Sequence, residues 1–177
     1  MVKNNKNKIK TPPPAKPTGV EFYFGKYAEA HQSPVNKFIQ VVFIPLMLFG
    51  LFGLLWAIPF PYIKFLGKYN NDFNWSSFFL AAIVYYYIKQ SPALAYVVLL
   101  VLLIYSFLVT QLAQWQKQGG PALWAVCGGI FVLSAVTLYM GYKKEGKKLS
   151  FEYRYKNILI APLFLVRLMF RRFSIRY

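Results

Sequence analysis

Histidine, cysteine and acidic residues are scarce in this chain, and their scarcity limits the chemistry that it can perform. The 177 residues include one histidine, one cysteine and five acidic residues. A single cysteine excludes an internal disulfide bond and a cluster of cysteine metal ligands. A serine hydrolase would have His31 as its only imidazole base, and the chain has no Gly-x-Ser-x-Gly motif around a nucleophile. Hydrolytic catalysis is therefore disfavoured.

Acidic residues are also missing from the apolar segments of the chain. Residues 38–56, 73–88, 92–110 and 122–142 contain neither Asp nor Glu. Proton pumps carry ionisable side chains within their membrane spans, so the sequence disfavours autonomous ion pumping. Phosphate-binding loops and dinucleotide-binding motifs are absent from the sequence as well.

Long apolar runs are what the chain does have. Hydrophobic residues make up 57% of it and aromatic residues 20%, more than a soluble domain carries. Residues 38–56 are broken only by Gln40 and approach the roughly 20 residues that cross a hydrocarbon core. Residues 92–110 and 122–142 are similar, while 73–88 is shorter and predicts a tilted or protein-shielded span. The sequence therefore predicts an all-α, multi-pass transmembrane bundle with about four spans.

Shorter segments flank the four predicted spans. Residues 18–37 predict an N-terminal interfacial helix that ends at Ser33, because proline disfavours a helical conformation in the residue before it. Residues 158–170 form an apolar stretch that is too short to span and predicts a C-terminal amphipathic or re-entrant segment. The expected organisation is a basic arm, one membrane domain and a basic tail, at residues 1–18, 19–172 and 173–177.

Positive charge is concentrated at the two ends of the chain. The net charge is +16, and with four spans 18 of the 21 Lys and Arg residues fall on one side of the membrane. This asymmetry is typical of positive-inside topology and disfavours nucleic-acid binding. Basic flanks also attract anionic lipids such as cardiolipin. The candidate headgroup contacts are Lys143, Lys144, Lys147, Lys148, Arg171 and Arg172.

Two features inside the spans predict contacts between helices. Gln40 is a strongly polar side chain within an apolar run, where an unpaired amide costs a few kcal/mol. We expect it to bind another span, or a lipid headgroup or substrate hydroxyl. Gly128 and Gly129 would permit close helix contact, and Cys127 is expected to serve packing.

Three short motifs resemble a known family. The first comprises Tyr27, His31, Pro34, Asn36, Gln40 and Pro45. The second lies within residues 141–148 and the third is Ala-Pro-Leu-Phe at residues 161–164. In this order and spacing they are similar to motifs of the membrane 2-hydroxy-fatty-acid dioxygenases of the yeast and bacterial type.

The resemblance implies a multi-pass protein and an iron(II) and O₂ chemistry that shortens 2-hydroxy fatty acids by one carbon. His31 matches the family's first histidine, Gln40 replaces the next, and Tyr142 replaces the histidine after Gly141. Glu145 roughly keeps an acidic position. Iron(II) oxygenases need two imidazoles and a carboxylate, so one chain with one histidine cannot supply this ligand set.

We therefore expect no cofactor and a non-catalytic relative of the family that serves as an accessory subunit of a larger membrane complex. A respiratory-type assembly of the mitochondrial inner membrane, with both termini in the matrix, is the first expectation. The endoplasmic reticulum, with cytosolic termini, is the alternative. Two other functions stay open: an iron(II)-dependent dioxygenase that uses His31 as a metal ligand, and a stand-alone lipid-binding or membrane-shaping protein.

Overall fold

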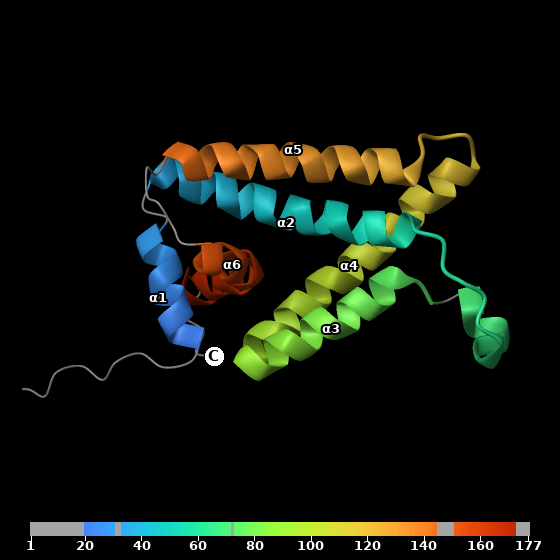
Figure 1. Ribbon diagram of the computed structural model, residues 1–177, viewed down its shortest axis with the longest axis horizontal. Coiled ribbons are helices and arrows are strands. Elements are labelled where there is room, and N and C mark those ends of the chain that lie inside the picture. The colour runs from blue at the N-terminus through green and yellow to red at the C-terminus, as the bar shows by residue number, and fades with distance from the viewer. Residues whose placement is uncertain (1–19, 31–32, 72, 145–150, 173–177) are drawn as a thin grey trace, which may run out of the picture.

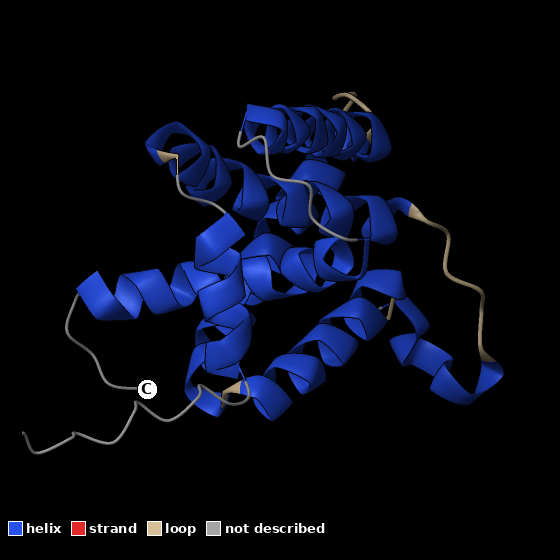
Figure 2. Ribbon diagram, turned by 60° about the vertical axis from the view of Figure 1, so that its left-hand side comes forward, coloured by secondary structure: helices blue, strands red, loops and turns tan. Residues whose placement is uncertain are grey.

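The computed structural model describes residues 20–30, 33–71, 73–144 and 151–172, and throughout these ranges it is helical without strands. The prediction of an all-α fold is confirmed. The elements are α1 (Val20–Ala30), α2 (Pro34–Ala57), the 3₁₀ segment η1 (Lys64–Asn71), α3 (Trp75–Gln90), α4 (Pro92–Lys117), α5 (Leu123–Lys144) and α6 (Phe151–Arg172). Connections are short, and Figure 2 shows them at the ends of the helices.

The helices form two antiparallel pairs, α2 with α5 and α3 with α4 (Figure 1). The α2–α5 pair has the most extensive contact of any two elements. Helices α1 and α6 lie where α2 begins and α5 ends, and both run across the direction of that pair (Figure 1). We call this the terminal end. The opposite end carries residues 58–71 and 118–122, and we call it the far end.

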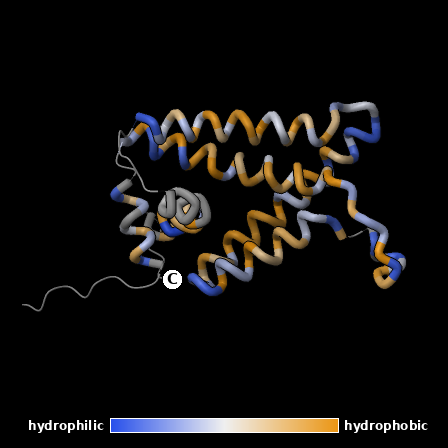
Figure 3. The backbone as a smooth tube through the Cα atoms, viewed as in Figure 1, coloured by the Kyte–Doolittle hydropathy of each residue, from blue (hydrophilic) through white to orange (hydrophobic). Residues whose placement is uncertain are grey.

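Helices α2, α4 and α5 are each long and apolar enough to cross a membrane, which fits an integral membrane protein. Figure 3 shows the apolar residues along them. Helix α3 has 16 residues, or about 24 Å at 1.5 Å per residue, which is shorter than a hydrocarbon core of about 30 Å. Three of the four expected spans thus have the required length, and the fourth stays a prediction.

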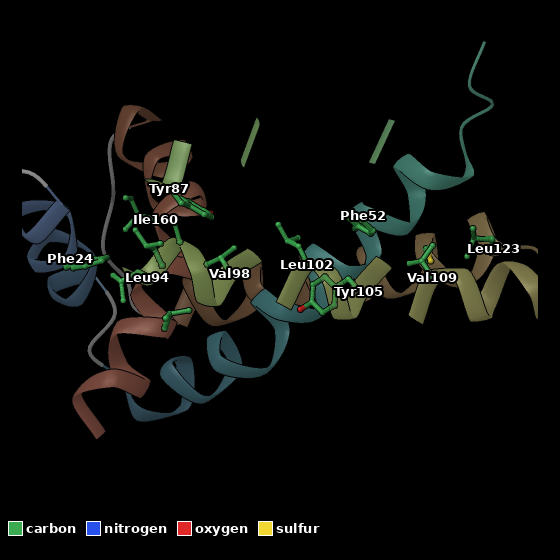
Figure 4. Packing of buried hydrophobic residues seen from close by; sticks show 14 residues of the cluster. Phe24, Phe52, Tyr87, Leu94, Val98, Leu102, Tyr105, Val109, Leu123 and Ile160 are labelled. Carbon is green, nitrogen blue, oxygen red and sulfur yellow. The ribbon is translucent and has the colours of Figure 1, made fainter. Parts of the chain in front are cut away.

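Helix α6 contains the apolar stretch expected at residues 158–170 and continues through Pro162. Ile160, Leu163 and Val166 are buried, and they belong to the same core cluster as Leu94 of α4. Figure 4 shows Ile160 and Leu94 near each other at one end of this core. The segment is therefore packed into the bundle. Whether it enters the membrane or lies on its surface stays a prediction.

Helices α2 and α5 approach each other closely at Gly50. A Cβ atom there would lie 2.8 Å from the Cys127 carbonyl oxygen and 2.8 Å from the Phe131 nitrogen, so only glycine permits this backbone contact. The close contact expected at Gly128 and Gly129 is met only in part, because a Cβ atom at Gly128 would lie at an ordinary contact distance, 3.6 Å, from the Leu54 side chain of α2. A Cβ at Gly129 would meet nothing within 4 Å, because this residue faces away from α2.

Candidate functional site

Residues of all three motifs meet at the terminal end. Tyr27 comes from α1, Asn36 and Gln40 come from the first turns of α2, and Gly141 comes from the last turns of α5. Ala161 and Phe164 come from α6, where Ala161 joins a buried cluster with Tyr27 and Phe164 packs against it. We call the set of Tyr27, Asn36, Gln40, Gly141 and Phe164 the motif junction.

A hydrogen bond between buried side chains lies at the centre of the motif junction. The Tyr27 hydroxyl donates to the Gln40 amide oxygen, and these residues are 3% and 6% exposed. Burial raises the pKa of the Tyr27 phenol, so this side chain keeps its proton and its role as donor. Gln40 was expected to bind another span, a lipid headgroup or a substrate hydroxyl, and its partner is instead a side chain of α1, which is not among the helices long enough to cross a membrane.

The ring of Tyr27 also contacts α6. Its centroid lies 4.6 Å from the centroid of Phe164, with 44° between the ring planes. Such tilted aromatic pairs contribute about 0.5–1.5 kcal/mol beyond the area that they bury. Tyr27, a residue of α1, thus contacts two other helices: α2 through its hydroxyl and α6 through its ring.

Asn36 and Gly141 join α2 to α5 at the same end. Asn36 is 1% exposed, and Gly141 is also buried. A Cβ atom at position 141 would lie 2.6 Å from the Asn36 Oδ1 atom and 3.4 Å from the Ile39 side chain. Two motifs more than 100 residues apart therefore contact each other because position 141 is a glycine.

Pro45, the last residue of the first motif, lies farther along α2. Its carbonyl oxygen accepts a hydrogen bond of 2.9 Å from the Tyr105 hydroxyl of α4. Ile44, next to it, is buried in the cluster with Tyr27. The first motif, which lies on α1 and α2, thus contacts three other helices, α4, α5 and α6.

The remaining candidate residues divide into exposed, half-buried and undescribed positions. Lys143 and Lys144 are exposed in the last turn of α5, as a headgroup contact requires, and Tyr142 beside them is half-buried. Arg171 and Arg172 end α6, where only the backbone is described. His31, Glu145, Lys147 and Lys148 lie outside the described residues.

The residues of the motif junction do not fit an iron(II) centre. An oxygenase iron takes imidazole and carboxylate ligands and keeps positions open for substrate and O₂. At the junction, Gln40 and Tyr27 are bonded to each other, and the phenol stays protonated. Within the described ranges, no three His, Cys, Asp or Glu side chains converge on one point. The junction is instead arranged as a set of packing contacts.

An ion pair between α1 and α6 was missed by the sequence reasoning. Arg167 donates to the Glu21 carboxylate, and its guanidinium lies 4.7 Å from the centroid of the Phe24 ring. The partners are 146 positions apart, so no local pattern links them. The isolated Arg167 within an apolar helix was the one available signal, since such a charge needs a partner.

Comparison with known proteins gave no family model, no curated protein and no solved structure that matches this chain. The resemblance to the dioxygenases therefore depends on the motif residues alone and stays a prediction.

Proposed function

We propose that this chain is a non-catalytic relative of the membrane dioxygenases that serves as an accessory subunit of a larger membrane complex. The observation that carries the proposal is the buried hydrogen bond between Tyr27 and Gln40. In the resemblance, position 40 is a histidine of the catalytic site. Here its side chain is used to join α1 to α2, so a ligand position has become a packing position.

The surface of the helices supports a role among other membrane components. Val132, Leu133 and Val136 of α5 are more than half exposed, and α5 packs mainly against α2. An apolar face of this kind contacts lipid or the helices of a partner subunit. We place the protein in the mitochondrial inner membrane with its basic termini toward the matrix, and take the endoplasmic reticulum as the alternative.

Anionic lipids are the second proposed partner. Lys143 and Lys144 are exposed at the terminal end, where α5 leaves the bundle. Each basic residue near an anionic membrane surface contributes about 1 kcal/mol of attraction. Cardiolipin, with two phosphates, suits a pair of adjacent lysines, and the contact would hold the terminal end at the membrane surface.

The test is native electrophoresis of the full-length protein after gentle extraction, followed by mass spectrometry of the band. The proposal predicts migration in a large assembly with partner subunits in constant ratio. A matched pair of variants locates the contact: Val132→Lys on the exposed face of α5 should release the chain, and Lys117→Gln at the end of α4 should not. A chain that runs alone would contradict the proposal and favour a stand-alone lipid-binding protein.

A further inference from the structure

The far end exposes two aromatic side chains between α2 and α3. Phe65 is 95% exposed and Tyr62 is 71% exposed. Burying a phenylalanine side chain contributes about 1.5–3 kcal/mol, which a ring left in water forgoes. A large ring that the protein itself leaves uncovered, at the end of a membrane helix, indicates contact with something outside the chain.

The backbone around these rings is held in a defined conformation. The Ile63 amide donates to the Asn70 Oδ1 atom at 2.7 Å, and the Leu66 amide donates to the Ile63 carbonyl at 3.0 Å. Gly67, which lies between Leu66 and Asn70 in the chain, turns the backbone with a φ of +49°, a conformation that favours glycine. These contacts hold the loop in one conformation, in which the side chain of Phe65 is exposed.

An aromatic cluster ties the same loop to the first turn of α3. The ring of Phe60 lies 5.4 Å from the ring of Trp75 and 5.8 Å from that of Phe78. The Trp75 indole N–H donates to the Pro59 carbonyl at 3.3 Å. Tryptophan and tyrosine concentrate where a bilayer meets water. A cluster of this composition is typical of the level of the membrane surface.

Positive charges flank the exposed rings. Lys64 and Lys68 are both exposed in η1, one on either side of Phe65 in the sequence. Lysines next to apolar and aromatic residues are typical of segments that lie in the membrane interface. The rings match the acyl region of a leaflet, and the ammonium groups match lipid phosphates.

We propose that residues 58–71 form a membrane anchor that dips into the leaflet at the far end. Phe65 and Tyr62 enter the acyl region, and Lys64 and Lys68 bind the phosphates of anionic lipids. The occupant is the bilayer crossed by α2, because the loop begins where α2 ends, at Ala57. This inference goes beyond the proposed function and does not depend on it.

The test measures the depth of position 65 in a bilayer. The full-length chain with Cys127→Ala receives one cysteine, by Phe65→Cys or, as the matched control, by Gln118→Cys in the other far-end loop. Each variant is spin-labelled and placed in vesicles of phosphatidylcholine and phosphatidylglycerol. The ratio of accessibility to O₂ over a water-soluble nickel chelate should be several-fold higher at position 65. Equal ratios would overturn the anchor and assign this surface to water or to a protein partner.

The charge contribution is tested in the same vesicles. Lys64→Gln with Lys68→Gln should shift the label at position 65 toward water when phosphatidylglycerol is present. In vesicles of phosphatidylcholine alone, these substitutions should leave the ratio unchanged. An unchanged ratio in both kinds of vesicle would overturn the contact with lipid phosphates. Both substituted lysines are exposed, so the fold should be kept. Native electrophoresis of each variant checks this.

Discussion

The terminal end and the far end of the bundle differ in what surrounds their aromatic and polar side chains. At the terminal end, Tyr27, Asn36 and Gln40 are at most 6% exposed and lie within the motif junction. At the far end, Phe65 and Tyr62 are mostly exposed. The terminal end pairs the buried Tyr27 hydroxyl with Gln40 inside the protein, and the far end leaves two aromatic rings exposed to their surroundings.

The difference separates contacts that form within the protein from contacts that need a bilayer. Buried hydrogen bonds at the terminal end need no lipid, because donor and acceptor belong to the same protein. The rings at the far end gain their stabilisation only in a bilayer. Substitutions at the terminal end should therefore change the stability of the fold, and those at the far end should change membrane contact.

The largest effect on the free energy of unfolding is expected at Gly50, in the contact between α2 and α5. Gly50→Ala should cost about 3 kcal/mol of unfolding free energy, because a methyl group 2.8 Å from the α5 backbone forces the helices apart. The matched control is Gly129→Ala, which meets nothing within 4 Å and should be neutral or stabilising by up to about 1 kcal/mol. Denaturant titration in detergent micelles measures both, and equal effects would refute the close contact.

Removal of the Tyr27 hydroxyl is expected to have the next largest effect. Tyr27→Phe leaves the buried Gln40 amide without this donor and should cost about 1–3 kcal/mol. Tyr62→Phe at the far end should cost nothing measurable, because that side chain is mostly exposed. The comparison of the two ends fails if both substitutions destabilise the protein equally.

A double variant sharpens this prediction. Replacing both partners of a buried hydrogen bond by apolar groups of similar shape is nearly neutral. Tyr27→Phe combined with Gln40→Met should therefore recover most of the stability that Tyr27→Phe loses. A double variant as unstable as the single one would mean that Gln40 has a further essential role.

The ion pair between α1 and α6 should contribute less. Glu21→Gln should cost about 1 kcal/mol or less, because the two side chains are 17% and 42% exposed and water weakens their attraction. The loss should shrink as salt is added. A cost that does not change with salt would contradict the ion pair.

The smallest effect is expected from Phe65→Ser. Its side chain contacts little of the protein, so the free energy of unfolding in detergent should change by less than about 0.5 kcal/mol. A larger loss in detergent would show that Phe65 stabilises the fold itself and would erase the contrast between the two ends.

Much of the helical structure followed from the sequence. Apolar runs placed α2 and α5 within four residues of their ends, whereas α4 continues to Lys117, seven residues beyond the predicted end at residue 110. Helix α3 was also predicted to span the membrane. It has 16 residues and is shorter than the other three predicted spans.

The contacts of the site followed only in part. Spacing placed Tyr27 and Gln40 in one motif, and the need of a buried amide for a partner predicted a hydrogen bond. The choice of partner depends on how α1 and α2 pack, which no local pattern encodes. The glycine contact was placed at Gly128 and Gly129, whereas a Cβ atom would meet the facing backbone at Gly50 of α2, because composition does not tell which face of a helix meets its neighbour.

The most direct test of the central claim is the iron content of the purified full-length protein after anaerobic loading with iron(II), measured with its O₂ consumption on a 2-hydroxy fatty acid. The account predicts no stoichiometric iron and no turnover, with the same result for the Tyr27→Phe and Gln40→Met double variant. About one iron per chain, with O₂ consumption that the double variant loses, would contradict it and make the motif junction a catalytic centre.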